Sequence, residues 1–498
     1  MRPLLNGFAH IVDIKTTESK EMNPETQRAN HTASQVVSAR MDRLPKLTRT
    51  HRRNIFILIA LFTFDLIDIG TLALVAPAVR AEWGMSLEAV GVLTSTTFIG
   101  MTIGAIVAGR VADRIGRKPT LITAVVVFST GSLLSAFATG PEWLGWARVV
   151  TGIGIGATSG IILVLVSEMF PKPLRGRMMA VIYGVSAISV PLMALLARVV
   201  IPAGLWHVIF LVGSGGFIVA LLAIKLLPES PRWMAAQGRL EQAEAEMSRF
   251  EAEYEEETGK QLPPPIYQDH QSSATGSIFD IFRKRVIGRT IVGSSLFILA
   301  TVLNYGLNSW FPVILIERGY PIADAYSFLL VLSCANFLGA LLSSTVIDRF
   351  ERKWLILGAS IILGLIYMVI GFVDNVPVLL IFGFSAGFVQ NAITTTVFTY
   401  MPEIFPVEIR GQGSGFSNGI GRLGGIANSL LIGVIIATFA TEGVFVYLTV
   451  ICALMVVVAL FGPVMGIRTA HLTLKQDKQT AAQQVVVAAQ QLPEAADR

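Results

Sequence analysis

Cysteine is nearly absent from this sequence, and charged residues are scarce. The 498 residues include two cysteines, Cys334 and Cys452, and both lie inside apolar runs. This placement argues against a disulfide framework, a zinc ribbon or a CxxC redox site. Charged residues make up 15% of the chain and hydrophobic residues 53%. Since a soluble globular protein carries about a quarter charged residues, the composition predicts an integral membrane protein.

Signals of several other protein classes are missing as well. Residues 1–50 mix charges of both signs with polar residues and lack the apolar core of a secretory signal. No HExxH is present, and neither GxSxG nor a Gly-rich phosphate loop occurs in a suitable context, which disfavours a membrane enzyme. We therefore expect no cofactor and no bound metal. The net charge of +5 is better explained by basic cytoplasmic loops, so we expect no nucleic-acid partner.

Twelve stretches are long and apolar enough to cross a bilayer, since about 20 residues span its core at a rise of about 1.5 Å per residue. The predicted spans are 54–79, 87–109, 119–139, 143–168, 177–200, 205–227, 287–314, 322–347, 354–373, 376–401, 411–438 and 443–467. The expected fold class is therefore an all-α membrane protein with twelve transmembrane helices.

Lysine and arginine are distributed unevenly between the two sides of these spans. One side has only Arg80, Arg198 and Arg318. The positive-inside rule places the other, basic side in the cytoplasm, and an even number of spans leaves both termini there. We expect a multi-pass protein of the plasma membrane, which in a bacterium is the inner membrane. The basic side collects Arg110, Arg114, Arg117, Lys118, Lys172, Arg175, Arg177, Arg349, Arg352, Lys353 and Arg410.

The spans divide the chain into five regions. Residues 1–53 form a cytoplasmic N-terminal tail that we expect to be poorly ordered, and 468–498 form a cytoplasmic C-terminal tail. Six-helix bundles occupy 54–227 and 286–467, and a cytoplasmic linker, 228–285, joins them. Its Glu-rich stretch, EQAEAEMSRFEAEYEEE, has no wide apolar face and predicts a short surface helix.

The two halves repeat one another at a constant offset. Asp113-Arg114 with Arg117-Lys118 recurs as Asp348-Arg349 with Arg352-Lys353, and 348 minus 113 is 235. The pattern Glu-x-Phe-Pro-x-x-x-Arg-Gly begins at Glu168 and again at Glu403, and 403 minus 168 is also 235. Pro77 and Pro312 keep the same spacing. One offset across three landmarks predicts two pseudo-symmetric six-helix bundles.

Three segments carry more specific motifs. They are GRVADRIGRK at 109–118, Arg148-x-x-x-Gly152-x-Gly154-x-Gly156, and PESPRW at 228–233. The first resembles, at every defining position, the signature loop of the major facilitator superfamily of secondary transporters. The second resembles its fourth-helix motif, and the third resembles the signature that ends the sixth helix in sugar and organic-solute porters. In the second copy of the loop, Ser344 and Glu351 replace glycines.

The resemblance implies a set of gate residues at the cytoplasmic ends of the helices. Glycine near a helix end permits close helix approach, and opposite charges can latch two bundles. We expect Glu168 with Arg175, and Glu403 with Arg410, to form ion pairs that break when the cytoplasmic side opens. For Lys118 and Lys353 the alternative is that they only set the topology. The implied gate residues are Gly109, Asp113, Arg114, Gly116, Arg117, Glu168, Arg175, Asp348, Arg349, Glu403 and Arg410.

Ionisable side chains within the spans are the sharper functional signal, because a charge at the bilayer centre costs about 2.5–3.5 kcal/mol. Asp65 and Asp68 are spaced i, i+3 and so share one face of the first helix. Two such close carboxylates disfavour simultaneous ionisation, which makes a proton site. At about 1.5 Å per residue, Arg148 lies level with Asp68, and Arg422 lies level with Asp65 in the opposite half.

We therefore predict that Asp65, Asp68 and Arg148 couple the carrier to protons. One of the aspartates pairs with Arg148 when ionised and releases it when protonated, and Arg422 helps to hold an anionic substrate. The alternative is a buried ion pair that only fixes helix packing, although burying ions is a poor source of stability.

Polar side chains at membrane depth complete the predicted substrate site. Amides that face a central cavity can orient a substrate by hydrogen bonds, and each of them can equally bind helix to helix. The run YGLNSWFP, which contains Tyr305 and Asn308, resembles the seventh helix of metabolite:proton symporters. The predicted binding residues are Asn304, Tyr305, Asn308, Trp310, Asn336, Gln390, Asn391 and Arg422.

The function that follows is proton-coupled symport of a small organic metabolite by alternating access. A carboxylate, such as an aromatic or sugar-derived acid, fits the arginines. Competing hypotheses are a drug:proton antiporter, a neutral sugar or polyol carrier, and a transport-dead nutrient sensor. The expected partners are the small-molecule substrate, protons and the lipid bilayer, and the protein is expected to act as a monomer.

Overall fold

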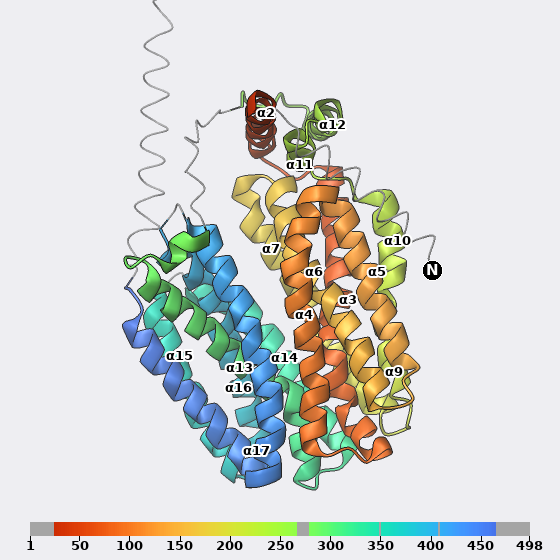
Figure 1. Cartoon of the computed structure of the whole chain (residues 1–498), viewed down its shortest axis with the longest axis vertical. Coiled ribbons are helices and arrows are strands. Elements are labelled where there is room, and N and C mark those ends of the chain that lie inside the picture. Colours follow the sequence, from red (N-terminus) through yellow and green to blue (C-terminus); the bar gives the residue numbers. More distant parts are fainter. Residues whose placement is uncertain (1–23, 266–277, 348–349, 407–408, 465–498) are drawn as a thin grey trace, which may run out of the picture.

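Two helical bundles lie side by side in the computed structural model of the chain (Figure 1). The structure describes residues 24–265, 278–347, 350–406 and 409–464. Within these ranges every regular element is a helix. The apolar spans predicted from the sequence therefore fold as helices that satisfy their backbone hydrogen bonds internally, as a bilayer requires.

The N-terminal bundle has six spans, of which the first four are single helices. The fifth and sixth spans are each divided into two helices at short breaks, at 187–188 and 214–215. Its helices are α3 (Arg49–Trp83), α4 (Leu87–Ile115), α5 (Arg117–Ala136), α6 (Pro141–Met169), α7 (Lys172–Ser186), α8 (Ser189–Val200), α9 (His207–Gly213) and α10 (Gly216–Leu226).

The C-terminal bundle supplies the remaining spans. Its helices are α13 (Ile287–Glu317), α14 (Ile322–Ile347), α15 (Arg352–Phe372), α16 (Val376–Ile404) and α17 (Arg410–Phe461). The last of these is 52 residues long and is interrupted at Ala440, whose backbone is non-helical (φ 55°, ψ −166°). It therefore counts as two spans. With this division, the eleven apolar stretches of the described residues give the twelve predicted transmembrane helices.

The polar helices outside the bundles differ from expectation in two ways. Residues 24–42, expected in a poorly ordered tail, form α2 (Pro24–Asp42). Helix α12 (Leu240–Thr258), predicted to lack a wide apolar face, buries a narrow apolar stripe made of Ala243, Met247, Phe250 and Tyr254. This stripe packs with α2 and α11 (Pro231–Ala236) into one apolar cluster at the top of Figure 1. A short 3-10 helix, η1 (Ile278–Phe282), precedes α13.

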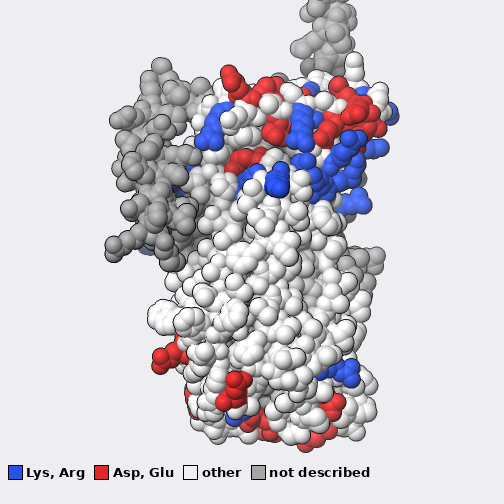
Figure 2. Space-filling view, turned by 90° about the vertical axis from the view of Figure 1, so that its right-hand side faces the viewer, with Lys and Arg blue, Asp and Glu red and all other residues white. Residues whose placement is uncertain are grey.

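Charged side chains gather at the two ends of the molecule. On the face shown in Figure 2, a broad uncharged belt separates a densely charged end from an end with few charges. We call the end that carries α2, α11 and α12 the basic end, and the opposite one the far end. An uncharged belt of this kind is the surface that lipid tails solvate. The chain is thus a multi-pass membrane protein.

Candidate functional site

Two buried carboxylates lie on α3, as the sequence predicts. Asp68 is fully buried and Asp65 is 3% exposed. Although they are only three residues apart, they meet different partners. Asp68 faces α5 and α6 inside the N-terminal bundle, whereas Asp65 lies in electrostatic range of Arg422 on α17, in the other bundle.

Asp68 and Arg148 form an ion pair in the interior of the N-terminal bundle. Arg148 Nη1 lies 3.5 Å from Asp68 Oδ1, and Nη2 donates to the Asp68 carbonyl oxygen at 2.8 Å. The hydroxyl of Ser132 on α5 donates to the same Oδ1. Both charged side chains are completely buried. Losing one partner of such a pair leaves a buried charge without compensation, which is strongly unfavourable.

One oxygen atom of this ion pair lacks a hydrogen-bond partner among the described residues. Arg148 Nε donates to Thr97 Oγ1 at 3.3 Å, and the guanidinium lies 5.6 Å from the centre of the Phe210 ring. Asp68 Oδ2, by contrast, has no hydrogen-bond partner among the described residues. A carboxylate with one oxygen unsatisfied is a place where a proton binds without displacing an existing hydrogen bond.

Arg422 reaches from the C-terminal bundle into the N-terminal one. Its Nη1 donates to the Met101 carbonyl oxygen of α4 at 3.1 Å. Asp65, Tyr183 and Tyr305 are the groups that act electrostatically on it. We call Asp65, Tyr183, Tyr305 and Arg422 the central cluster, because they come from α3, α7, α13 and α17 and lie within electrostatic range of Arg422 where the two bundles face each other.

Aromatic rings flank the central cluster on both sides. Phe98 of α4 contacts Tyr305 edge-on, with ring centres 4.7 Å apart. Phe62 of α3 contacts Tyr183 with ring centres 4.4 Å apart. One cation, one carboxylate and several ring faces are thus gathered at the junction of the bundles, which is the composition of a site for a small organic anion.

Three of the predicted amides are linked in a chain on the C-terminal side. Asn308 Nδ2 donates to the Asn304 carbonyl oxygen at 2.8 Å and lies 3.3 Å from Asn304 Oδ1. Asn336 Nδ2 of α14 donates to Asn308 Oδ1 at 3.1 Å. All three side chains are partly buried. The chain connects α13 to α14 and leaves polar atoms one turn from Tyr305.

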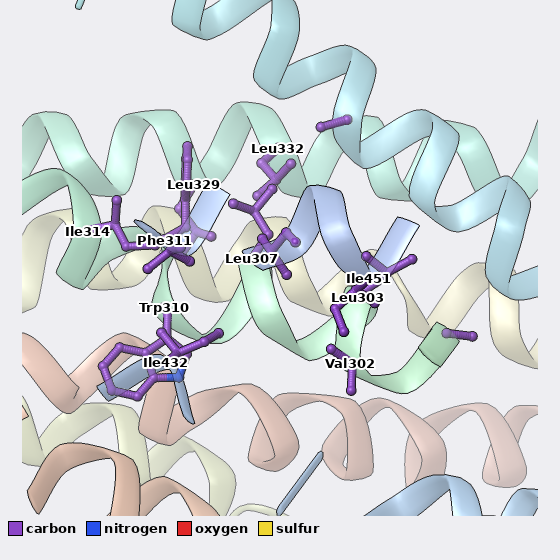
Figure 3. Close-up of a cluster of buried hydrophobic side chains, with 14 of the residues drawn as sticks. Val302, Leu303, Leu307, Trp310, Phe311, Ile314, Leu329, Leu332, Ile432 and Ile451 are labelled. Atoms are coloured by element: carbon purple, nitrogen blue, oxygen red, sulfur yellow. The ribbon is translucent and has the colours of Figure 1, made fainter. Parts of the chain in front are cut away.

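The other three predicted binding residues are engaged in helix packing in this conformation. Trp310 is 1% exposed and lies among apolar side chains, next to Ile432 in Figure 3. Gln390 is 2% exposed and accepts a hydrogen bond from the Tyr367 hydroxyl at 3.0 Å. Asn391 Oδ1 lies 3.2 Å from the Thr395 hydroxyl on the same helix. The structure does not bring these side chains to the central cluster.

At the basic end, the motif charges pair differently from the sequence expectation. Glu168 pairs with Arg117 (Nη2 to Oε1, 3.1 Å) and not with Arg175, which pairs with Asp42 of α2 at 2.7 Å. Glu403 pairs with Arg352 at 3.4 Å. The expectation failed because it paired residues close in sequence. In the structure, the start of α5, which carries the end of the loop motif, packs beside the end of α6, which carries Glu168.

The remaining gate residues have simpler surroundings. Asp113 pairs with Arg117 on the next turn at 2.9 Å, and Arg114 and Arg410 are exposed. Asp348 and Arg349 lie outside the described residues. A Cβ atom built on Gly109 meets no described atom within 4 Å. Gly109 therefore makes no close helix contact in this conformation.

Gly116 and Glu229 join the signature loop to the segment after the sixth span. Gly116 has φ +110°, and a Cβ atom there would lie 2.2 Å from Glu229 Oε2. The Glu229 carboxylate accepts from the backbone N–H of Arg117 and of Lys118, each at 3.1 Å, and so caps the start of α5. Burial raises the pKa of Glu229 above its ordinary value, opposed by these backbone hydrogen bonds.

Lys118 and Lys353 cap the ends of neighbouring helices. Lys118 Nζ donates to the Ile224 carbonyl oxygen of α10 at 2.8 Å. Lys353 Nζ donates to the carbonyl oxygens of Leu460 and Gly462, at 2.8 and 2.9 Å, where α17 ends. A lysine at a helix C-terminus satisfies carbonyls that lack partners. These two residues therefore stabilise the ends of neighbouring helices, in addition to any effect on membrane topology.

Besides the central contacts of Arg422 with Met101 and of Tyr305 with Phe98, the bundles contact each other toward the far end. The Tyr326 hydroxyl of α14 donates to the Leu74 carbonyl oxygen of α3. A Cβ atom on Gly91 of α4 would lie 2.5 Å from the carbonyl oxygen of Ser429 on α17. Together with the open space at Gly109, these contacts describe bundles that are closed on each other at the far end.

Several of these residues were missed from the sequence. Thr97 and Ser132 lie in hydroxyl-rich stretches of their spans, and such residues most often bond their own helix. Tyr183 is an aromatic residue of an apolar span and carries no motif. Arg80 and Glu317, an ion pair between α3 and α13, stand at span ends, where charge is ordinary. Only their three-dimensional neighbours distinguish them.

Known proteins similar to this chain are transporters. The sequence profile of the family described as "Sugar (and other) transporter" matches residues 54–479. YyaJ of Bacillus subtilis, named for metabolite transport, is 32% identical over 446 residues, covering 88% of this chain and 97% of YyaJ. The niacin transporter NiaP of Acinetobacter baylyi is 27% identical over 395 residues, covering 79% and 89%.

A solved structure shares the fold. The xylose transporter XylE of E. coli, in a partially occluded inward-open conformation, aligns with a TM-score of 0.64 at 18% identity. The alignment covers 82% of this chain and 97% of XylE. At this identity the likeness concerns the arrangement of the helices alone.

Proposed function

Because this chain belongs to the family of sugar and other transporters, within the major facilitator superfamily, we propose that it is a proton-coupled symporter of a small organic carboxylate. The observation that carries the proposal is the pair of buried carboxylates on α3. Asp68 is bound to Arg148, and Asp65 acts on Arg422 across the junction of the bundles. Charges at this depth need a function or a partner.

Proton coupling rests on Asp68 and Arg148. Ionised Asp68 holds the guanidinium through Oδ1 and the backbone carbonyl, which ties α3 to α6. A proton on Asp68 removes half of the ion pair, so the contact between these two helices weakens. Protonation and deprotonation thus favour two different packings of the N-terminal bundle, which is what a coupling site requires.

Anion binding rests on Arg422 and Asp65. Ionised Asp65 acts electrostatically on Arg422 and offsets part of its charge, although the two side chains form no direct ion pair among the described contacts. When Asp65 takes a proton, Arg422 is left with a charge that a substrate carboxylate can neutralise. Proton and anion therefore bind together, because each removes the cost of the other. The proton on Asp65 and one monovalent carboxylate together carry no net charge, and a proton on Asp68 adds one positive charge, so we expect a pH gradient to drive uptake.

An aromatic acid is the substrate class that the site supports best. Tyr183 and Tyr305 act electrostatically on Arg422, and the rings of Phe62 and Phe98 contact these two tyrosines. Flat ring faces favour stacking. Niacin, the substrate named for one relative, is itself an aromatic carboxylic acid. We propose that the two halves rock about this cluster, with the basic end in the cytoplasm of a cell whose plasma membrane holds the protein.

Uptake of labelled nicotinate and benzoate into proteoliposomes tests the proposal. A pH gradient, acid outside, should drive accumulation by the unmodified protein. Asp68→Asn and Asp65→Asn should abolish uphill accumulation and leave exchange of labelled for unlabelled acid measurable. Asp324→Asn, at an exposed position on α14, serves as the matched control. Undiminished gradient-driven accumulation in both variants and in the double variant would remove the coupling assignment.

The same vesicles separate the competing function. A drug:proton antiporter would expel a cationic dye when the gradient is imposed, and neutralising the aspartates would stop that efflux. Dye efflux without accumulation of either acid would replace the symport proposal.

A further inference from the structure

One ion pair joins the ends of α3 and α13 at the far end. Arg80 Nη1 donates to Glu317 Oε1, and the two side chains are 29% and 28% exposed. Helix α3 belongs to the N-terminal bundle and α13 to the C-terminal bundle. The pair must therefore break whenever the two bundles separate at this end.

A cavity of about 450 Å³ lies beside the ion pair. Arg80 is the one charged residue of its lining, and Arg80 Nε is buried without a hydrogen-bond partner among the described residues. Glu317 does not line the cavity. The walls come from the ends of α3 and α13, the 84–85 turn and the start of α14; the lining residues are Pro77, Arg80, Ala81, Gly84, Met85, Val313, Ile316 and Ile322.

An apolar cavity with a single guanidinium is suited to an organic acid. The apolar body loses its contact with water against the walls, and the carboxylate pairs with the fork of the arginine. Arg80 lines the cavity, whereas its ion-pair partner Glu317 does not. A carboxylate in the cavity therefore competes with Glu317 for the guanidinium from a side on which the cation has no carboxylate partner.

We propose that Arg80 is an anion-responsive latch of the far end. It holds Glu317 while the cavity is empty, and it exchanges Glu317 for the carboxylate of an organic acid that arrives at this end. The exchange frees α3 from α13 and favours opening. The proposal rests on the proposed function in one respect, namely that the acid is of the transported class, but the site lies apart from the central cluster.

The exchange costs little free energy, because one carboxylate replaces another on the same cation. Ion pairs between partly exposed side chains contribute little to stability, so a competitor that also buries apolar surface displaces one partner readily. The hydrogen bond between Tyr326 and Leu74 remains as a second contact between the bundles. Because this contact remains, binding of the acid shifts the equilibrium toward opening of the far end but does not break every contact there.

The test measures how accessible the far-end contact between the bundles is. Ser429→Cys, a conservative change at a 1% exposed position packed against Gly91, is introduced into the full-length protein after Cys334→Ala and Cys452→Ala. Nanodiscs expose both ends to a polar maleimide, and benzoate is the probe acid. Ala203→Cys, exposed in the turn after α8, reports reagent reactivity alone.

The single variants, the two probe compounds and the charge-swapped variant each have a defined expected result. Glu317→Gln and Arg80→Gln should both label about two- to fivefold faster without benzoate, which corresponds to losing one partly exposed ion pair. Benzoate should speed labelling of the protein that has both native residues, and benzyl alcohol should not. Combining Arg80→Glu with Glu317→Arg should restore slow labelling and remove the benzoate response, because the cation then no longer lines the cavity.

Three results would overturn the proposal. They are single variants that label at the original rate, a protein with both native residues that ignores benzoate, and a charge-swapped variant that still responds to it. Arg422→Gln separates this proposal from the proposed function. That variant should lose transport and keep the benzoate response at Ser429→Cys. If the protein with all native residues transports none of the acids while its benzoate response persists, the latch stands and the symport proposal falls.

Discussion

Arg117 at the start of α5 forms an ion pair with Glu168 in the last turn of α6. The corresponding residues of the second half, Arg352 and Glu403, form the same pair. Each pair lies within one bundle and joins its third span to its fourth. In this conformation the motif charges therefore hold each bundle together at the basic end, and the two bundles are tied to each other at the far end.

The first prediction concerns the Arg117–Glu168 pair, whose side chains are 13% and 15% exposed. Glu168→Gln or Arg117→Gln should each lower the stability of the folded protein by about 1–3 kcal/mol, since a charged hydrogen bond is lost in a largely buried place. Because the two residues act on each other, the double variant should lose less than the sum of the single losses.

Thermal unfolding in detergent, followed by tryptophan fluorescence, measures this effect. Arg249→Gln, at an ion pair of α12 whose arginine is 45% and whose glutamate is 16% exposed, is the control and should lower the midpoint less than either variant. Strict additivity of the two single variants would show that the ion pair contributes nothing.

The second prediction uses glycines to shift the balance between conformations. Gly91→Ala and Gly433→Ala would place a Cβ atom 2.5 and 2.6 Å from backbone oxygens of the opposite bundle. Both variants should therefore disfavour closure of the far end. Gly109→Ala meets open space and should leave this conformation undisturbed.

Double electron–electron resonance between spin labels on α4 and α17 reports the separation of the bundles. Longer distances at the far end are expected for Gly91→Ala and Gly433→Ala, with no increase for Gly109→Ala. Equal distance distributions in all three variants would mean that these close contacts do not control the conformational balance.

The third prediction concerns backbone strain and crowding at Gly116. Gly116→Ala combines a backbone at φ 110°, ψ 162°, a region essentially restricted to glycine, with a Cβ atom 2.2 Å from Glu229 Oε2, whereas Gly204 has φ +74° and open space around its Cβ position. Gly204→Ala should cost about 1 kcal/mol, the strain of an L-residue in that region, and Gly116→Ala should cost clearly more. Midpoints of thermal unfolding compare the two directly. A similar loss of stability in both variants would show that the contact with Glu229 contributes nothing.

The fourth prediction is a pH dependence of the α2 packing. Burial raises the pKa of Glu251, but hydrogen bonds from Arg40 and Arg43 outweigh it, so the pKa is lowered below its ordinary value. A carboxylate with a lowered pKa stabilises the folded arrangement above its unfolded pKa of about 4.3. This stabilisation is lost as the pH falls through the lowered pKa, so α2 should loosen below about pH 4.

A spin label at Ser38, in a cysteine-free protein, detects the motion of α2 as the pH is lowered. Glu251→Gln should increase the label's mobility already at neutral pH and flatten its pH dependence. Glu241→Gln, at an exposed position on α12, is the matched control. A label in the unmodified protein that stays as rigid as at neutral pH throughout the acid titration would contradict the prediction.

The membrane part of the fold was predictable because its signal is local. Long apolar runs and a repeat at one constant offset require no knowledge of packing, and the predicted span ends agree with the helix ends of the described residues to within six residues. Residues 465–467 of the last predicted span lie outside the described residues. The order of α2 was not predictable in this way. Its sequence is polar, and it is stabilised by Val37 and Met41 packing on α11 and α12, which are distant in the sequence. The apolar stripe of α12, with spacings of four, three and four, was visible in the sequence but was undervalued.

The depth of the candidate site residues in the membrane was predictable, but the direction in which each side chain points was not. Counting the helical rise residue by residue placed Asp68 level with Arg148, and the structure brings them together. The rotation of a helix about its axis is not given by composition when all its faces are apolar. For that reason Gln390 and Trp310, expected at the substrate site, lie instead in helix packing within the C-terminal bundle.

Among the described residues of the spans, the buried carboxylates are Asp65 and Asp68 in the first half of the chain, while the linked amides Asn304, Asn308 and Asn336 all belong to the second. Under the proposed function, the proton-carrying groups therefore belong to the first half of the chain, while the substrate site takes side chains from both halves. A chimaera that keeps the first half and takes the second from a relative should change which acids it accepts while still running on protons. Directed evolution toward new acids would then do best to leave the opening helix untouched.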